Sequence, residues 1–125
     1  MKTILIVEDN EKNLKLVRDV LRFKGYTTIE ATTAVEGLRL AREQLPALVL
    51  MDILLPDFDG ITALARLRAD QATRAIPVIA LSASAMPDDQ EKIISSGFDA
   101  YLTKPIQIKG FIELIERFIG KAEKV

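Results

Sequence analysis

Short apolar runs alternate along the chain with longer segments in which apolar residues recur every three or four positions. The short runs predict β-strands near residues 3–7, 27–31, 47–51, 77–82 and 100–103. The longer segments predict helices near residues 11–24, 34–44, 60–69, 88–96 and 108–119. Alternation of this kind is typical of a parallel sheet with helices on both faces and right-handed crossovers. The pattern therefore predicts an α/β fold with three layers.

Polar residues and glycines mark where several of these helices begin and end. Thr33 and Glu36 have capping-box spacing at the start of the second helix. Asp88 and Glu91 repeat that spacing at the fourth helix, although Pro87 could instead be its first residue. Left-handed glycine caps commonly end helices, and we expect such ends at Gly25, Gly97 and Gly120.

Composition narrows the class of protein. A chain of 125 residues that is 49% hydrophobic and 28% charged predicts one globular domain, residues 1–125. The net charge of −1 is spread along the chain without a basic stripe, so we expect no nucleic-acid partner. No apolar run approaches 18 residues, so no membrane span is expected. The absence of cysteine and histidine excludes disulfides, a histidine base and the usual zinc sites, and accords with a cytoplasmic protein.

Charged and hydroxyl side chains stand at the ends of four predicted strands. Glu8 and Asp9 follow the first strand, Asp52 follows the third, Ser82 ends the fourth, and Lys104 follows the fifth. The carboxyl ends of parallel strands lie side by side, and open α/β sheets bind ligands there. The three acids, the lysine and the serine are therefore expected to meet at one edge of the sheet.

This set of residue types suits a divalent metal and a phosphoryl group. Carboxylates are good ligands for Mg²⁺, and a cation would relieve their mutual repulsion. Asp52 could act as an oxygen nucleophile, Lys104 could bind a phosphoryl oxygen, and the Ser82 hydroxyl could donate to the same group. Each residue alone has an ordinary reading as a turn, a cap or a loop residue. It is their joint occurrence at strand ends that favours a functional site.

Five motifs make the chain resemble the receiver domains of two-component response regulators. They are residues 6–10 (IVEDN), 50–56 (LMDILLP), 59–60 (DG), 81–83 (LSA) and 104–105 (KP). The resemblance covers almost the whole chain and implies a flavodoxin-like (βα)5 fold with strand order 2-1-3-4-5. The Glu-Asp form of the acidic pair and residues 100–106 (AYLTKPI) are most similar to single-domain cell-cycle regulators of this family.

The resemblance also implies roles for individual residues. Asp52 would be the phosphoacceptor, and Lys104 would bind the phosphoryl group. Glu8, Asp9, Asp52 and the backbone carbonyl of Leu54 would bind Mg²⁺, for which Mn²⁺ could substitute; the longer Glu8 stands where many members have aspartate. The switch residues would be Ser82 and Tyr101, and a cis peptide bond is expected between Lys104 and Pro105.

Partners are implied in the same way. The phosphodonor would be a histidine kinase or a histidine phosphotransfer protein, and the output would be a contact with a downstream protein. The expected signalling face combines the fourth helix, fifth strand and fifth helix, at Ile93, Ile94, Tyr101 and Leu114. The first helix has two apolar rows, more than one face can bury, and one row could dock the phosphodonor: Leu14, Val17 and Leu21, or Leu16, Val20 and Phe23.

Three alternatives remain at this point. A haloacid-dehalogenase-like phosphatase would need a second acid two residues after the nucleophile, where this chain has Leu54. A flavodoxin-like FMN carrier would need a Ser/Thr/Gly-rich phosphate loop after the first strand, where residues 8–11 read EDNE. The third is a receiver domain excised from a hybrid histidine kinase. None of these is required by the residues, and the response-regulator reading is preferred.

Overall fold

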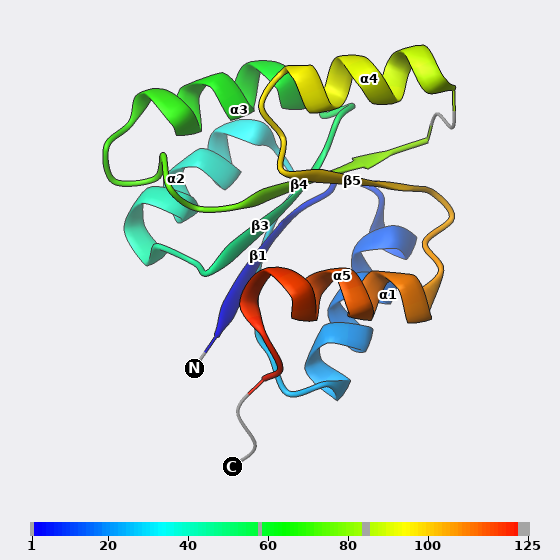
Figure 1. Ribbon diagram of the computed structural model, residues 1–125. Helices are drawn as coiled ribbons and strands as arrows, with labels where there is room; N and C mark the ends of the chain where they lie inside the picture. Colours follow the sequence, from blue (N-terminus) through cyan, green and yellow to red (C-terminus); the bar gives the residue numbers. More distant parts are fainter. Residues whose placement is uncertain (1, 58, 84–85, 123–125) are drawn as a thin grey trace.

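The computed structural model describes residues 2–57, 59–83 and 86–122, which form a three-layer α/β sandwich (Figure 1). The strands are β1 (Thr3–Val7), β2 (Thr27–Ala31), β3 (Leu48–Asp52), β4 (Val78–Ser82) and β5 (Ala100–Thr103). The helices are α1 (Glu11–Phe23), α2 (Ala34–Gln44), α3 (Gly60–Ala69), α4 (Pro87–Ser95) and α5 (Ile108–Ile119). Each predicted element is present, and every bound agrees with the prediction to within one residue.

All strands are parallel and follow the order β2-β1-β3-β4-β5. This order confirms the predicted flavodoxin-like topology. In Figure 1, α2, α3 and α4 lie above the sheet, whereas α1 and α5 lie below it.

The two faces of the sheet bury alternate residues of the same strands. On β1, Leu5 and Val7 pack in the cluster under α2, α3 and α4, whereas Ile4 and Ile6 pack in the cluster with α1 and α5. Because successive strand side chains point to opposite faces, a strand buried on both faces is apolar throughout. This explains why the strands appear as continuous apolar runs in the sequence.

The helix caps confirm one capping prediction and correct another. Thr33 Oγ1 accepts a hydrogen bond from Glu36 N (3.2 Å), as expected for the N-cap of α2. The capping box at Asp88 and Glu91 was wrong, because α4 begins at Pro87 and its N-cap is Met86, without a side-chain cap bond. Proline suits this first helical position because it has no N–H to satisfy.

Three helices are followed by glycines with positive φ, as predicted, at Gly25, Gly97 and Gly120. Helix α2 differs, because its C-cap residue after Gln44 is Leu45, which lies in the left-handed region (φ 46°). Pro46 follows, and a residue before proline is disfavoured in the helical region. The end of α2 is therefore marked by proline, without a glycine.

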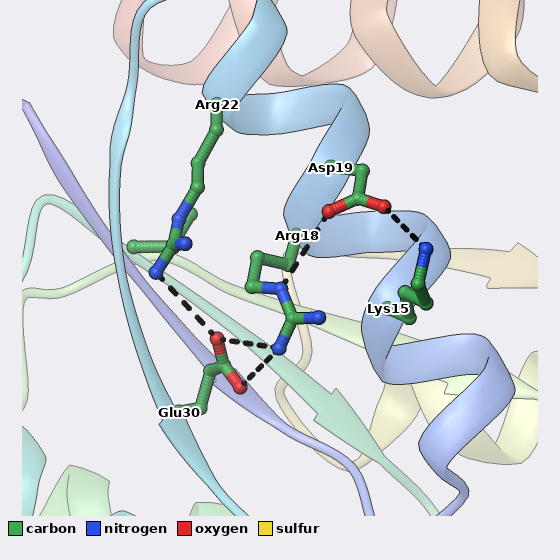
Figure 2. Close-up of polar contacts among 6 residues, drawn as sticks. Lys15, Arg18, Asp19, Arg22 and Glu30 are labelled. Carbon is green, nitrogen blue, oxygen red and sulfur yellow. Dashed lines mark hydrogen bonds and ion pairs between the residues drawn. The ribbon is translucent and has the colours of Figure 1, made fainter.

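Helix α1 covers the sheet with one apolar row and leaves part of the other on the surface. Leu14, Val17 and Leu21 are buried, whereas Leu16 is exposed and Phe23 is 86% exposed. Polar contacts hold α1 beside the edge strand β2. Arg18 Nη1 lies 3.1 Å from Glu30 Oε1 (Figure 2), and Arg22 Nε donates to Thr28 Oγ1 (2.9 Å). Within the helix, Lys15 pairs with Asp19 (3.2 Å; Figure 2). Such partly exposed ion pairs contribute little stability individually, but together they orient the helix.

Candidate functional site

The predicted site residues gather at the carboxyl edge of the sheet. Glu8 and Asp9 follow β1, Asp52 is the last residue of β3, Ser82 is the last residue of β4, and Lys104 follows β5. The strand order places β3 between β1 and β4, so Asp52 lies at the centre of this edge.

Lys104 bridges two of the acids. Its Nζ donates a hydrogen bond to Asp52 Oδ2 (2.8 Å) and lies 2.7 Å from Glu8 Oε1. Burial alone would lower the pKa of Lys104, but the hydrogen bond to Asp52 and the contact with Glu8 raise that pKa above its usual value. The ammonium group therefore keeps its charge and is fixed in front of the Asp52 carboxylate.

Glu8 is the most deeply buried acid of the site. Its side chain is fully buried, and neither carboxylate oxygen accepts a well-aligned hydrogen bond from any residue that the structure describes. The Lys104 contact is thus an ion pair without hydrogen-bond alignment. Burial and the adjacent Asp52 carboxylate raise the pKa of Glu8 to about 7, against the opposing effect of Lys104.

The acids have the arrangement that a cation site needs. Glu8, Asp9 and Asp52 each offer one carboxylate oxygen, and these three oxygens lie within 4.8 Å of one another. A divalent cation would satisfy the orphaned Glu8 oxygens and reduce the carboxylate repulsion. The donor set is hard and consists of oxygen, which suits Mg²⁺.

Backbone contacts hold the nucleophile candidate in place. Asp52 Oδ1 accepts a hydrogen bond from Leu54 N (3.0 Å), and Ile53 N donates to Leu81 O on β4 (3.1 Å). Gly60 N donates to Ile53 O (2.8 Å), which closes the loop after β3. The Leu54 side chain is 73% exposed. The Asp52 carboxylate is therefore preorganised, and Leu54 borders the site from the solvent side.

The two switch candidates lie on adjacent strands and on the same face of the sheet. Tyr101 pairs in register with Ala80, and Ser82 is two residues beyond Ala80 on β4. Ala80 belongs to the core cluster under α4, and the Tyr101 ring packs against the same cluster. The Tyr101 hydroxyl donates to Gln90 Oε1 on α4 (2.8 Å). Tyr101 thus links β5 to α4.

Some expectations about the surface change in the structure. Ile93 was wrong as a surface residue, because only 4% of it is exposed and it belongs to the core. Ile94 is exposed, and Leu114 is partly buried against the cluster of α1 and α5.

The Lys104–Pro105 peptide bond is cis, as predicted. No helix in the described part of the chain is long and apolar enough to cross a membrane.

Two polar residues near the site were missed from the sequence. Gln90 is the partner of the Tyr101 hydroxyl. Asp57, in the loop after β3, accepts hydrogen bonds from Ala34 N (2.8 Å) and Val35 N (2.9 Å) at the start of α2. The proline before Asp57 marks a loop in the sequence, but no local spacing indicates a partner 23 residues away.

Known proteins are similar to this chain in sequence and in structure. Residues 4–116 match the model of the response regulator receiver domain family. The polar-differentiation response regulator DivK of Brucella ovis is 47% identical over 97% of this chain and 98% of its own length. DivK of Brucella anthropi has the same identity and coverage.

Solved structures agree. One is the receiver domain of sensor histidine kinase PA1611 from Pseudomonas aeruginosa, which has a magnesium ion coordinated in its active-site cleft. It is 34% identical to this chain and superposes with a TM-score of 0.88, covering 96% of this chain and 98% of that one. A response regulator from Chloroflexus aurantiacus has a TM-score of 0.90 at 28% identity, with the same coverage of both chains. The sequence and structural likeness both extend over nearly the whole chain, and the protein belongs to the response regulator receiver domain family.

Proposed function

We propose that this protein is a phosphorelay response regulator that accepts a phosphoryl group on Asp52 and signals through a phosphorylation-dependent protein contact. The observation that carries the proposal is the Lys104 ammonium, which lies within 2.8 Å of Asp52 Oδ2 and beside the buried, unsatisfied Glu8. The domain would span residues 1–125 and work in the cytoplasm. Neither a nucleic acid nor a membrane is expected as a partner.

Phosphoryl transfer would proceed at the Asp52 carboxylate. One of its oxygens attacks the phosphorus of a phosphohistidine, the P–N bond breaks with its electron pair left on the imidazole nitrogen, and an acyl-phosphate forms. Lys104 would move its hydrogen bond from Asp52 to a phosphoryl oxygen. Attack by water on the phosphorus would later restore the carboxylate and release phosphate. The protein therefore promotes its own phosphorylation and dephosphorylation without a separate substrate.

Glu8, Asp9, Asp52 and the Leu54 carbonyl would hold Mg²⁺, or Mn²⁺ in its place. The cation would neutralise charge on the transferring group. The described oxygens of the three acids fit this role because they converge, and because Glu8, apart from its ion pair with Lys104, has no hydrogen-bond partner among the described residues.

Partners would use two surfaces. A histidine kinase or histidine phosphotransfer protein would dock beside α1, where Leu16 and Phe23 are exposed. The downstream target would bind the face of α4, β5 and α5, where Ile94 is exposed and Tyr101 is half-buried. Ser82 would contact the new phosphoryl group and transmit its presence to Tyr101.

A second candidate keeps the chemistry and changes the context. The likeness to the receiver domain of sensor histidine kinase PA1611 favours a receiver that is part of a hybrid kinase. The match to DivK over 98% of that protein's length favours a stand-alone regulator, which we prefer. An immunoblot of cells of the source organism would separate the two, because a hybrid kinase would migrate far above a 13.9 kDa chain.

The decisive experiment is phosphorylation in vitro. Acetyl phosphate should add one phosphoryl group to the wild-type protein when Mg²⁺ is present and none when it is chelated, as read by intact mass. Asp52→Asn should abolish the addition, whereas the control Asp88→Asn, at an exposed position on α4, should retain it. Phosphorylation that persists in Asp52→Asn would refute the assignment.

A further inference from the structure

We propose that Asp57 is a positioning residue for the metal site: by tying the loop after β3 to the start of α2, it holds the Leu54 backbone where the cation binds. The inference rests on the proposed function, because it assumes that this edge of the sheet binds Mg²⁺.

The Leu54 backbone needs an external support. Its side chain is 73% exposed and packs too little to fix the residue. Its N–H donates to Asp52 Oδ1 (3.0 Å), and this bond fixes the start of the loop. The other end of the loop is fixed by Gly60 N, which donates to Ile53 O (2.8 Å). The segment between these points contains Asp57.

Asp57 supplies a support from outside the loop. Its two carboxylate oxygens accept separate backbone hydrogen bonds, Oδ1 from Ala34 N (2.8 Å) and Oδ2 from Val35 N (2.9 Å). A carboxylate at a helix N-terminus is favoured by both the free N–H groups and the helix dipole. Two bonds to one planar group fix its orientation as well as its position.

Helix α2 has its own cap and does not explain the contact by itself. Thr33 Oγ1 already accepts from Glu36 N at the third position of the helix. Asp57 therefore adds a tertiary connection, across 23 residues, between a rigid helix and the loop that carries Leu54. Groups that hydrogen-bond directly to metal ligands commonly change metal affinity by about 10–100-fold when removed; Asp57 acts on Leu54 only through the loop between them, so we expect an effect at the lower end of that range.

The test compares two caps of the same helix. Mg²⁺ dissociation constants are measured by amide NMR titration of the metal-free protein, and thermal stability is measured in parallel. Asp57→Ala should weaken Mg²⁺ binding by about tenfold, and Asp57→Asn, which keeps one acceptor oxygen, should fall between it and the wild type. The control Thr33→Ala should lose thermal stability because a cap bond is gone, yet bind Mg²⁺ as the wild type does.

The outcomes separate this inference from the proposed function. If Asp57→Ala and Asp57→Asn bind Mg²⁺ as tightly as the wild type, Asp57 is only a cap, and the inference fails while the function stands. If Thr33→Ala weakens Mg²⁺ binding as much as Asp57→Ala does, the inference also fails, because any loosening of α2 would then be enough to weaken Mg²⁺ binding. If Asp57→Ala does not fold, Asp57→Asn decides by the same criterion. A wild-type protein that binds no Mg²⁺ would refute the proposed metal site itself.

Discussion

Gly60 lies so close to the backbone of Asp52 that a side chain would collide with it. A Cβ at this position would be 2.6 Å from Asp52 O and 3.0 Å from Ile53 Cα, and both are backbone atoms that cannot move aside. We expect Gly60→Ala to lower the free energy of unfolding by about 1–3 kcal/mol, the usual range for overpacking, and to disturb phosphorylation of Asp52. Chemical denaturation and intact mass after acetyl phosphate would measure the two effects.

A second glycine provides the matched control. Gly110 lies within α5, and in the described part of the chain a Cβ there would meet no heavy atom within 4 Å apart from its chain neighbours and the nearby backbone of its own helix. Gly110→Ala should raise the free energy of unfolding by roughly 0.5–1 kcal/mol, because alanine favours the helix. Equal effects of the two substitutions would show that contact with the Asp52 backbone is not what constrains Gly60.

Leu54 concerns the lifetime of the phosphorylated state. It lies two residues after Asp52, beside the carboxylate, and its side chain is apolar and exposed. An apolar side chain can hinder the hydrolytic water but cannot align it by a hydrogen bond. We expect Leu54→Asn to shorten the half-life of the acyl-phosphate, as followed by loss of the phosphorylated mass after the donor is removed. An unchanged or longer half-life would contradict this role.

At the residue scale, the sequence predicted which side chains form the site better than it predicted individual contacts. We could predict that Glu8, Asp52 and Lys104 meet, because a parallel sheet aligns the ends of its strands. The contact of Asp57 with α2 could not be predicted, because it depends on how the loop after β3 folds back over the sheet. Ile93 was misplaced for a related reason: the sequence shows that α4 is amphipathic, but not which isoleucine faces the core.

Among the elements, β4, β5 and α4 would form the relay that we propose. The buried Ser82 ends β4 beside Asp52, and Tyr101 on β5 is held to Gln90 on α4 by a 2.8 Å hydrogen bond. Phosphorylation adds about 1.5–2 negative charges and three acceptor oxygens. A ligand shifts such an equilibrium only by its differential interaction with the two states. We infer that the Ser82 hydroxyl supplies part of that difference.

Ser82→Ala should therefore accept phosphate but transmit it poorly. Amide NMR shifts of residues 88–119 on addition of beryllofluoride should be smaller than in the wild type. Ser95→Ala is the control, since among the residues that the structure describes the Ser95 hydroxyl bonds to Lys92 O of its own helix α4 (3.1 Å). If Ser82→Ala shows the full wild-type shifts, the relay does not pass through this hydroxyl.

For the whole molecule, the topology was predictable because each level of the sequence agreed. Apolar strands buried on both faces, amphipathic helices and right-handed crossovers leave few arrangements. The bounds that moved did so by one residue, as at the start of α4, where Pro87 and the capping-box spacing of Asp88 and Glu91 mark different first residues. These shifts change caps and leave the strand order intact.

Metal binding should stabilise the whole fold. Because the acids converge at one edge of the sheet only in the folded protein, a cation at the proposed site would bind the native state and not the unfolded chain. A ligand at 100 times its dissociation constant adds about 2.7 kcal/mol. We expect Mg²⁺ to raise the melting temperature of the wild type, and to raise it less in Asp9→Asn. Calorimetry with and without chelator measures this, and an unchanged wild-type melting temperature would refute the site.

The charge state of Glu8 links stability to pH. In the folded, metal-free protein its pKa is raised from 4.5 to about 7. The native state therefore binds more protons than the unfolded state between these values, so the free energy of unfolding falls as pH rises through this range. One pKa unit corresponds to about 1.4 kcal/mol, so a pKa raised from 4.5 to about 7 is worth about 3.5 kcal/mol in all, of which on the order of 2–3 kcal/mol should be lost between these two pH values. Asp19 and Asp59 have lowered pKa values, and their contributions change only at more acidic pH.

Urea denaturation between pH 5 and pH 7.5 in the presence of chelator tests this directly. The wild type should lose stability across the range, whereas Glu8→Gln, which stays neutral, should give a flatter profile. Saturating Mg²⁺ should also flatten the wild-type profile, because the cation binds the deprotonated carboxylate and favours it in the native state. A wild-type profile that is flat, or that rises with pH in chelator, would mean that Glu8 is ionised in the metal-free fold. In that case Lys104 alone would compensate the charge of both acids.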